Sequence, residues 1–165
     1  MIHILGEKSN SKLTAVQDGD SQPNAIDLRL GKVFAMNNAM FELSEGYKKH
    51  RGTEEIYHDE DGWYHLQEGT YEVVMENIVT VGADEAGWVI TRSTLNRNGV
   101  FITSGLYDSG YNGVMAGAMH VRGGPVLIQK GTRVAQFLLF KAEALTLYNG
   151  SYGSNSEHDK KYTKE

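Results

Sequence analysis

Short runs of β-branched and apolar residues, separated by Gly, Asn and Asp, recur along this chain and constrain its fold more than any other feature. The runs are Ala25–Leu30, Tyr71–Val81, Trp88–Thr91, Val100–Thr103, Val114–Val121 and Val134–Phe140. Such runs, bounded by turn-forming residues, are typical of β-strands. No long segment has apolar residues at helical spacing, so the pattern predicts an antiparallel all-β domain, built as a sandwich or a barrel.

The last of these runs, VAQFLLF, is almost continuously apolar. A half-buried strand alternates apolar and polar residues, whereas a continuous apolar run indicates a strand covered on both faces. We therefore expect residues 134–140 to form a central strand, or one that a partner subunit covers.

The rest of the chain divides into one domain and a tail. Nineteen glycines and only two prolines favour many tight turns within a single β domain over residues 1–148. Residues 44–69 are rich in Lys, Glu, Asp and His, which predicts a polar insertion, such as a hairpin, before the next strand. Residues 149–165 have too little apolar surface to fold alone, which predicts a flexible C-terminal tail.

Composition narrows the classes of function. A net charge of -5 argues against a general nucleic-acid binder, which normally carries a basic face. The chain has no cysteine, which excludes disulfide scaffolds, cysteine nucleophiles and the zinc nucleobase deaminases, whose metal needs cysteine ligands. No apolar stretch reaches the length of a membrane helix, so we expect a cytoplasmic protein that binds neither membrane nor nucleic acid.

Two segments concentrate polar groups suited to a phosphorylated ligand. TRSTLNRNG (residues 91–99) carries Arg92, Ser93 and Arg97, whose guanidinium and hydroxyl groups are donors for phosphate oxygens. GLYDSGYNG (residues 105–113) carries Asp108 between glycines, where a carboxylate can act as a general base on water. Taken singly, each segment is better explained as a solvated turn.

The remaining motifs give little further evidence about function. KGTRVAQF (residues 130–137) places a Gln at the start of an apolar strand, where it can bond a phosphate or a neighbouring backbone. His50, His58 and His65 lie among acidic residues, a pattern more typical of a solvated charged face than of a metal site. The chain has no P-loop, dinucleotide-binding or nucleophile-elbow motif.

In their order along the chain, these segments resemble the motifs of the dUTPase and dCTP deaminase superfamily. AIDLRLGKVF (residues 25–34) is similar to the first motif, TRSTLNRNG to the second, GLYDSGYNG to the third and KGTRVAQFLLF to the fourth. SYGSNSEHDKKY (residues 151–162) resembles the C-terminal tail that closes over the triphosphate. A single motif of this kind is weak evidence for the family, but several of them in the same order are specific evidence. The resemblance implies a distorted β-barrel or jelly-roll-like fold and a homotrimer with shared active sites.

The resemblance also implies roles for individual residues. Asp108 matches the carboxylate that activates the hydrolytic water, and Tyr111 matches the aromatic residue that packs on the deoxyribose. Asp27 matches a residue near the metal and triphosphate, where Mg2+ is held mainly by the triphosphate. The expected phosphate-binding and tail positions are Arg92, Ser93, Arg97, Gln136, Tyr152 and Lys161, with Gly150 and Gly153 beside them.

One departure from the pattern bears on the reaction. In dCTP deaminases a Glu follows the third-motif Asp by ten residues and transfers protons, but here Ala118 stands at that position. The spacing of the second motif, with Arg97, nevertheless follows the deaminase branch. Loss of a proton-transfer group costs about a hundredfold to ten-thousandfold in rate. The resemblance therefore favours a pyrimidine nucleotide hydrolase that converts dUTP to dUMP and diphosphate.

Two alternatives stay open at this point. The first is a dCTP deaminase that uses another residue as its base, or a related enzyme that acts on a modified pyrimidine nucleotide. The second is a module that binds nucleotides or proteins with little catalysis and uses residues 44–69 as its partner surface.

Overall fold

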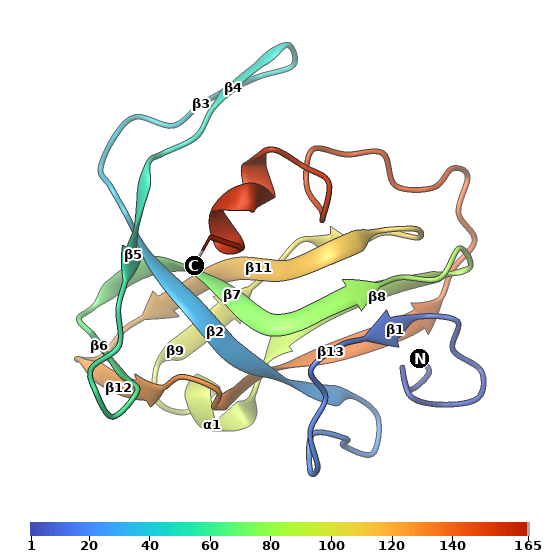
Figure 1. Ribbon diagram of the computed structural model, residues 1–165, viewed down its shortest axis with the longest axis horizontal. Helices are drawn as coiled ribbons and strands as arrows, with labels where there is room; N and C mark the ends of the chain where they lie inside the picture. Colours follow the sequence, from blue (N-terminus) through green and yellow to red (C-terminus); the bar gives the residue numbers. More distant parts are fainter. Residues whose placement is uncertain (165) are drawn as a thin grey trace.

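The computed structural model describes residues 1–164, and its architecture is almost entirely β (Figure 1). Its strands are β1 (Lys12–Leu13), β2 (Ile26–Met36), β3 (Glu42–Ser44), β4 (Tyr47–Lys49), β5 (Thr53–Ile56), β6 (Trp63–Leu66), β7 (Gly69–Thr80), β8 (Glu85–Thr91), β9 (Val100–Thr103), β10 (Leu106–Tyr107), β11 (Asn112–Val121), β12 (Val126–Gln129) and β13 (Arg133–Lys141). The helical parts are α1 (Ser93–Asn96) and the 3-10 helix η1 (His158–Tyr162). No helix among the described residues is long and apolar enough to cross a membrane.

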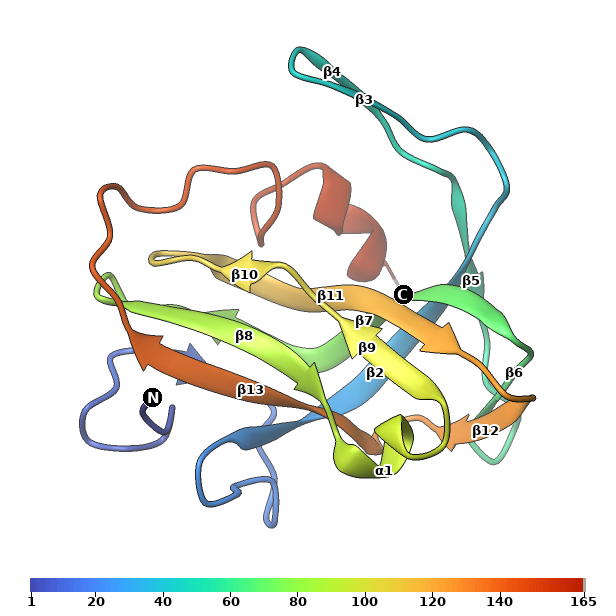
Figure 2. The ribbon, with the colours of Figure 1, turned by 180° about the vertical axis from the view of Figure 1, so that it is seen from behind.

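One antiparallel sheet dominates the molecule. Its strands follow the order β10-β8-β13-β2-β7-β11-β9, with β1 on β7 and β5 on β2. The Thr91 hydroxyl on β8 donates to the carbonyl oxygen of Ile102 (2.9 Å) and accepts from its N–H (2.7 Å). Because Ile102 lies on β9, at the far end of the strand order, this side chain joins the two ends. The sheet therefore curls into a partly closed barrel (Figure 2), which confirms the predicted all-β, barrel-like fold.

The core fills the inside of this curl. Its largest fully buried side chains include Phe137, Ile26, Leu28, Met115 and Met119. β13 lies between β8 and β2, so residues 134–140 do form a central strand. From Ala135 to Phe140 the strand nevertheless alternates, since one face is buried and the other, with Leu138 and Phe140, is half-buried. The prediction that both faces of this strand are covered is therefore only partly met within one chain, because the face with Leu138 and Phe140 is half-buried.

Residues 44–69 do not form one excursion. The β3–β4 hairpin projects from the body as an arm (Figures 1 and 2), while β5 pairs with β2 and β6 pairs with β12. The C-terminal segment packs back on the body: the Tyr162 ring is buried against Phe34 and Val74. The flexibility expected of residues 149–165 in solution stays a prediction.

A buried carboxylate braces the end of the barrel near the predicted catalytic turn. Glu85 is fully buried and accepts hydrogen bonds from the hydroxyl of Ser11, the N–H of Asn10 (2.8 Å) and the ammonium of Lys141 (2.9 Å). Burial alone would raise the pKa of Glu85, but these donors together lower it. The carbonyl oxygen of Glu85 also accepts the Ser109 hydroxyl (2.6 Å), which ties the turn that carries Asp108 to this network.

We expect Glu85→Gln to lower the free energy of unfolding at neutral pH by about 1–3 kcal/mol, because a buried charge-assisted network loses its acceptor. The lowered pKa means that this contribution is present above the carboxyl's ordinary pKa and is lost as pH falls through the folded value. The difference between variant and parent should therefore shrink below about pH 4. Asp84→Asn, at an exposed partner of the same lysine, is the control. Equal denaturation midpoints for the Gln variant and the parent at pH 7 would contradict the role.

Candidate functional site

A pocket lies where β10 and β11, which follow each other in the chain, do not pair. β9 pairs with β11 at residues 118–121, but the next strand, β10, pairs with β8 instead. Residues 112–117 of β11 therefore lack a ladder partner on that side, although they still pair with β7 on the other. The pocket beside this gap has a volume of about 450 Å³, within the range of small-molecule sites.

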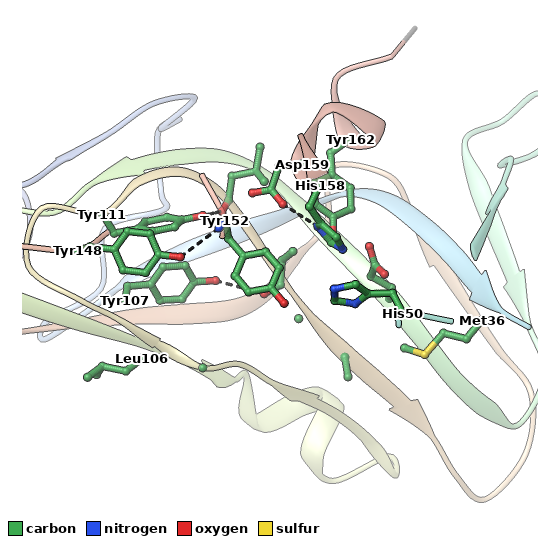
Figure 3. Close-up of a pocket in the computed structure, with 16 residues that line it drawn as sticks. Met36, His50, Leu106, Tyr107, Tyr111, Tyr148, Tyr152, His158, Asp159 and Tyr162 are labelled. Carbon is green, nitrogen blue, oxygen red and sulfur yellow. Dashed lines mark hydrogen bonds and ion pairs between the residues drawn. The ribbon is translucent and has the colours of Figure 1, made fainter. Parts of the chain in front are cut away.

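Aromatic rings line one end of the pocket (Figure 3). Tyr111 packs edge-on against Tyr107 and Tyr148, with ring centroids 5.4 and 5.2 Å apart. Its hydroxyl donates to the carbonyl oxygen of Val114 (2.7 Å), and that of Tyr107 donates to Ala116 (3.3 Å). Burial raises the pKa of both phenols, which keeps them neutral. This end offers flat, rigid surfaces on which a planar ring can stack.

Ionisable side chains line the other end. Glu72 comes from β7, His50 from the segment before β5, and His158 and Asp159 from the C-terminal tail. The His158 ring lies 4.6 Å from that of His50, and its Nδ1 lies 2.9 Å from Asp159. Burial, with the neighbouring His158 and Lys48, lowers the pKa of His50.

The tail reaches this pocket through its glycines. A side chain at Gly113 would lie 2.6 Å from the Cα of Gly153, so only glycine allows the tail to approach β11 this closely. The N–H of Gly153 donates to Asp159 (2.6 Å), and Tyr152 lines the pocket with its ring edge-on to His158. Gly150 lies beside the ring of Tyr148. Lys161 pairs with Glu72 at 2.8 Å.

Asp108 lies in the turn between β10 and β11, next to the pocket-lining Tyr107. The turn is closed by a hydrogen bond from the N–H of Tyr111 to the carbonyl oxygen of Asp108 (3.0 Å). Asp108 itself is exposed, and none of the hydrogen bonds and ion pairs found among residues 1–164 uses its carboxylate. The carboxylate is therefore free to meet water or a ligand.

A second polar cluster gathers around Asp27, which is fully buried on β2. One carboxylate oxygen accepts a hydrogen bond from Gln136 (3.0 Å). The other lies 3.4 Å from both Arg92 and Arg133 but has no aligned hydrogen-bond partner. The side chains of Arg92 and Arg133 are 29% and 35% exposed, and each guanidinium group has five N–H donors, more than these contacts use.

The remaining predicted residues of the second motif surround α1. Arg92 precedes this short helix, Ser93 begins it and Arg97 follows its last residue as the C-cap. Ser93 and Arg97 are exposed. The structure therefore brings Arg92, Asp27 and Gln136 into contact and leaves Ser93 and Arg97 accessible beside them; their roles stay predictions.

The two clusters are separate within one chain. β10, which leads into Asp108, and β2, which carries Asp27, are separated in the sheet by β8 and β13. Three strand spacings correspond to about 14 Å along the sheet. A single ligand held by both clusters of one chain would have to bridge this separation.

Sequence reasoning missed Glu72, His50 and His158. Glu72 lies in a run read only as a strand, and its position in the pocket follows from its register opposite Ala118. His50 is exposed, as the acidic surroundings predict, yet it lines the pocket. His158 falls within the tail segment 151–162 that the motif comparison marks, but no local signal identifies the histidine itself or either of the other two residues.

Comparisons with known proteins agree with this architecture. The profile of the family described as dCTP deaminase-like matches residues 2–142. A probable deoxyuridine 5'-triphosphate nucleotidohydrolase from Methanococcoides burtonii is 31% identical over 82% of this chain and 82% of its own length. A protein of the same description from Methanopyrus kandleri is 32% identical over 91% of this chain and 99% of its own length.

Solved structures share the fold at low identity. The 2'-deoxycytidine 5'-triphosphate deaminase from Agrobacterium tumefaciens has a TM-score of 0.62 at 20% identity, covering 82% of this chain. This chain spans only 44% of that protein's length. A dUTPase from phage phi11 of Staphylococcus aureus, described with a structural Mg(II) ion, has a TM-score of 0.52 at 10% identity, covering 86% and 97% of the two chains. At these identities the likeness shows the fold alone.

We expect Asp27→Asn to reduce the free energy of unfolding by roughly 1–3 kcal/mol, because Arg92 and Arg133 lose their shared counter-ion. The cost stays below that of a fully buried pair, since both guanidinium groups reach solvent. Chemical denaturation measures the change, with Asp18→Asn at an exposed position as control. An unchanged midpoint for Asp27→Asn would show that the cluster does not depend on its charge.

Proposed function

The chain belongs to the dCTP deaminase-like family, and we propose that it is a dUTP diphosphatase, which converts dUTP and water into dUMP and pyrophosphate. One observation carries the proposal: a free carboxylate, that of Asp108, lies in the turn beside the pocket, while Ala118 lines the pocket where a deaminase would need an acid. Relatives at 31% and 32% identity, described as probable dUTP nucleotidohydrolases, support the same reaction.

The proposed mechanism uses the pocket for the nucleoside. The uracil ring enters the gap between β10 and β11, where unpaired backbone groups can read its edge, and Tyr111 packs on the deoxyribose. Asp108 accepts a proton from a water molecule that attacks the α-phosphorus. A new P–O bond forms to this water, the bond to the oxygen that bridges to the β-phosphorus breaks, and pyrophosphate leaves.

The second cluster is proposed to hold the phosphates. Arg92 and Arg97 offer guanidinium groups, and Ser93 and Gln136 add neutral donors. Tyr152 and Lys161 of the tail complete the closure over the substrate. Because the two clusters lie apart in one chain, we propose a homotrimer in which Asp108 of one subunit works with the arginines of a neighbour.

The divalent ion is proposed to arrive with the substrate as Mg2+–dUTP. No group of three or more His, Asp or Glu side chains among residues 1–164 is arranged to hold a metal. Asp27 is already flanked by two guanidinium groups, which disfavours a cation carried by that residue alone. When bound, the ion neutralises charge that develops on the phosphates. A cytoplasmic location stays a prediction.

The two alternatives make different demands. Deamination needs a proton-transfer group; the motif position holds Ala118, and the pocket's carboxylate opposite it is Glu72 on β7, so release of ammonia from dCTP distinguishes this alternative. A module that only binds nucleotides or proteins would show no turnover at ordinary enzyme rates.

We expect Asp108→Asn to reduce pyrophosphate release from Mg2+–dUTP by about 10²- to 10⁴-fold, the usual effect of removing a general base. Coupled-enzyme detection of pyrophosphate measures the rate, and chelation of Mg2+ should abolish it. Asp61→Asn, at another exposed Asp in a turn, is the matched control. Release that persists in Asp108→Asn would refute the assignment.

The shared site is tested by mixing subunits. Asp108→Asn and Arg92→Ala homotrimers are each expected to be inactive, and their co-refolded mixture is expected to regain activity. Recovery requires that one subunit supply Asp108 and its neighbour supply Arg92. A mixture that stays inactive, although both variants fold and assemble on size-exclusion chromatography, would place both groups in one subunit's site.

A further inference from the structure

The β3–β4 arm has no strand partner in the body of the molecule. Within the described residues β3 and β4 form a sheet of their own, and Leu43 and Tyr47 are more than half exposed. The arm spans residues 37–52 and is closed at its base by a hydrogen bond from the N–H of Asn37 to the carbonyl oxygen of Gly52 (2.9 Å). A two-stranded hairpin is at best marginally stable alone in water. The arm is therefore stabilised by any contact that it makes with the rest of the chain.

The C-terminal tail makes such contacts. The ammonium of Lys48, on β4, donates a hydrogen bond to the Ser151 hydroxyl (3.0 Å) and lies 5.2 Å from the centroid of the Tyr152 ring. The ring of His50, at the end of the arm, lies 4.6 Å from that of His158 (Figure 3). Two arm residues thus meet three residues of the tail at the pocket.

These contacts involve the part of the tail that burial holds least. At the end of the tail the Tyr162 ring is buried against Phe34. Tyr152 is 43% exposed, and Lys48 lies over its ring while His158 lies edge-on to it. The position of the Tyr152 ring at the pocket therefore depends on the arm more than that of Tyr162 does.

We propose that the β3–β4 arm is a clasp for the C-terminal tail, in which Lys48 and His50 are positioning residues that hold Tyr152 and His158 at the pocket. Lys48 acts through the tail and does not line the pocket itself. The effect of the clasp on turnover rests on the proposed function, in which Tyr152 closes over the substrate. Its effect on the position of the tail does not.

The two histidine rings make the clasp sensitive to pH. Partial burial, followed by neighbouring charges, lowers the pKa of His50. Those charges are on His158, Lys48 and Lys161, while Glu72 opposes the shift. The other titratable groups around the rings are Asp159, Tyr152 and Tyr162. Because His158 and Lys161 lie on the tail, docking of the tail favours neutral His50. This contribution is present above about pH 6.5 and is lost as pH falls through the lowered pKa.

Amide hydrogen exchange of the full-length protein, followed by mass spectrometry, reports whether the tail is docked. The N–H groups of Gly153 and Ser154 donate to Asp159 (2.6 Å) and to the carbonyl oxygen of Asn112 (2.9 Å), so docking protects them. We expect Lys48→Met to lower the protection of residues 151–156 about three- to tenfold, because one cation–π contact and one hydrogen bond are lost. Lys48→Arg keeps the charge and should retain most of the protection.

Lys49→Met is the matched control. Lys49 is the next residue of β4, and neighbouring residues of a strand point to opposite faces. Its ammonium pairs with Glu42 within the arm at 3.4 Å, and both side chains are largely exposed. Loss of an exposed ion pair has little effect, so the protection of the tail should stay as in the parent.

The contact must also act in the other direction. A coupling between two segments is reciprocal, so Tyr152→Ala should lower the protection of residues 42–49 in the arm. With Mg2+–dUTP, Lys48→Met should raise KM while kcat changes less than about twofold, and Lys48→Arg should restore KM. If the protein does not turn over dUTP, the proposed function fails, and hydrogen exchange still decides the clasp.

Protection measured from pH 8 to pH 5, corrected for the intrinsic exchange rate, tests the histidine contact. In the parent the protection of the tail should fall below about pH 6.5, because two protonated rings repel each other. His50→Phe keeps a ring that cannot be charged, so its protection should change less over this range. Protection of β7, in the core, is the internal reference.

The clasp is overturned if Lys48→Met leaves the tail as protected as in the parent. It is overturned equally if Lys49→Met gives the same loss, or if Tyr152→Ala leaves the arm unchanged. A flat pH profile in the parent, or the same profile in His50→Phe, would reject the role of His50.

Discussion

The pocket depends on one feature of the backbone: β10 does not pair with β11, the strand that follows it. A hairpin that continued its ladder would satisfy every N–H and C=O between its strands and leave no space for a ligand. Here β9 pairs with β11, and β10 then pairs with β8, while β7 keeps the other edge of β11 in place. The hydroxyl of Thr91, bonded to both backbone groups of Ile102, holds β8 and β9 together where this exchange occurs.

The same arrangement explains why the polar groups fall into two clusters. The turn that carries Asp108 is held at one end of the barrel by Ser109 and the buried Glu85. The Asp27 cluster forms where β2 and β13 meet, and its buried carboxylate orients two partly exposed guanidinium groups. The two clusters lie in one sheet but are held by different strand pairings, β8 with β10 for one and β2 with β13 for the other. This separation is the reason for proposing that neighbouring subunits share a site.

The sequence predicts the site residues that lie in motifs, but not those that reach the site through strand register. Arg92, Asp27 and Gln136 lie in three separate segments, and their order along the chain was sufficient to group them; the contacts to Asp27 agree with that grouping. Glu72 could not be found in this way. Its place opposite Ala118 requires the register of β7 with β11, which shifts between Val114 and Ala116 at an irregularity that no local pattern reveals.

The sequence by itself determined that the chain is all-β, where its main strands lie and which turn carries a carboxylate suited to catalysis. Those properties are local, because alternation, turn residues and short motifs act within a few neighbouring residues. Only the tertiary structure decided that β10 separates from β11, which tail residues line the pocket, and that Glu72 meets Lys161 there. These are consequences of strand pairing and packing between distant segments, which depend on the whole chain at once.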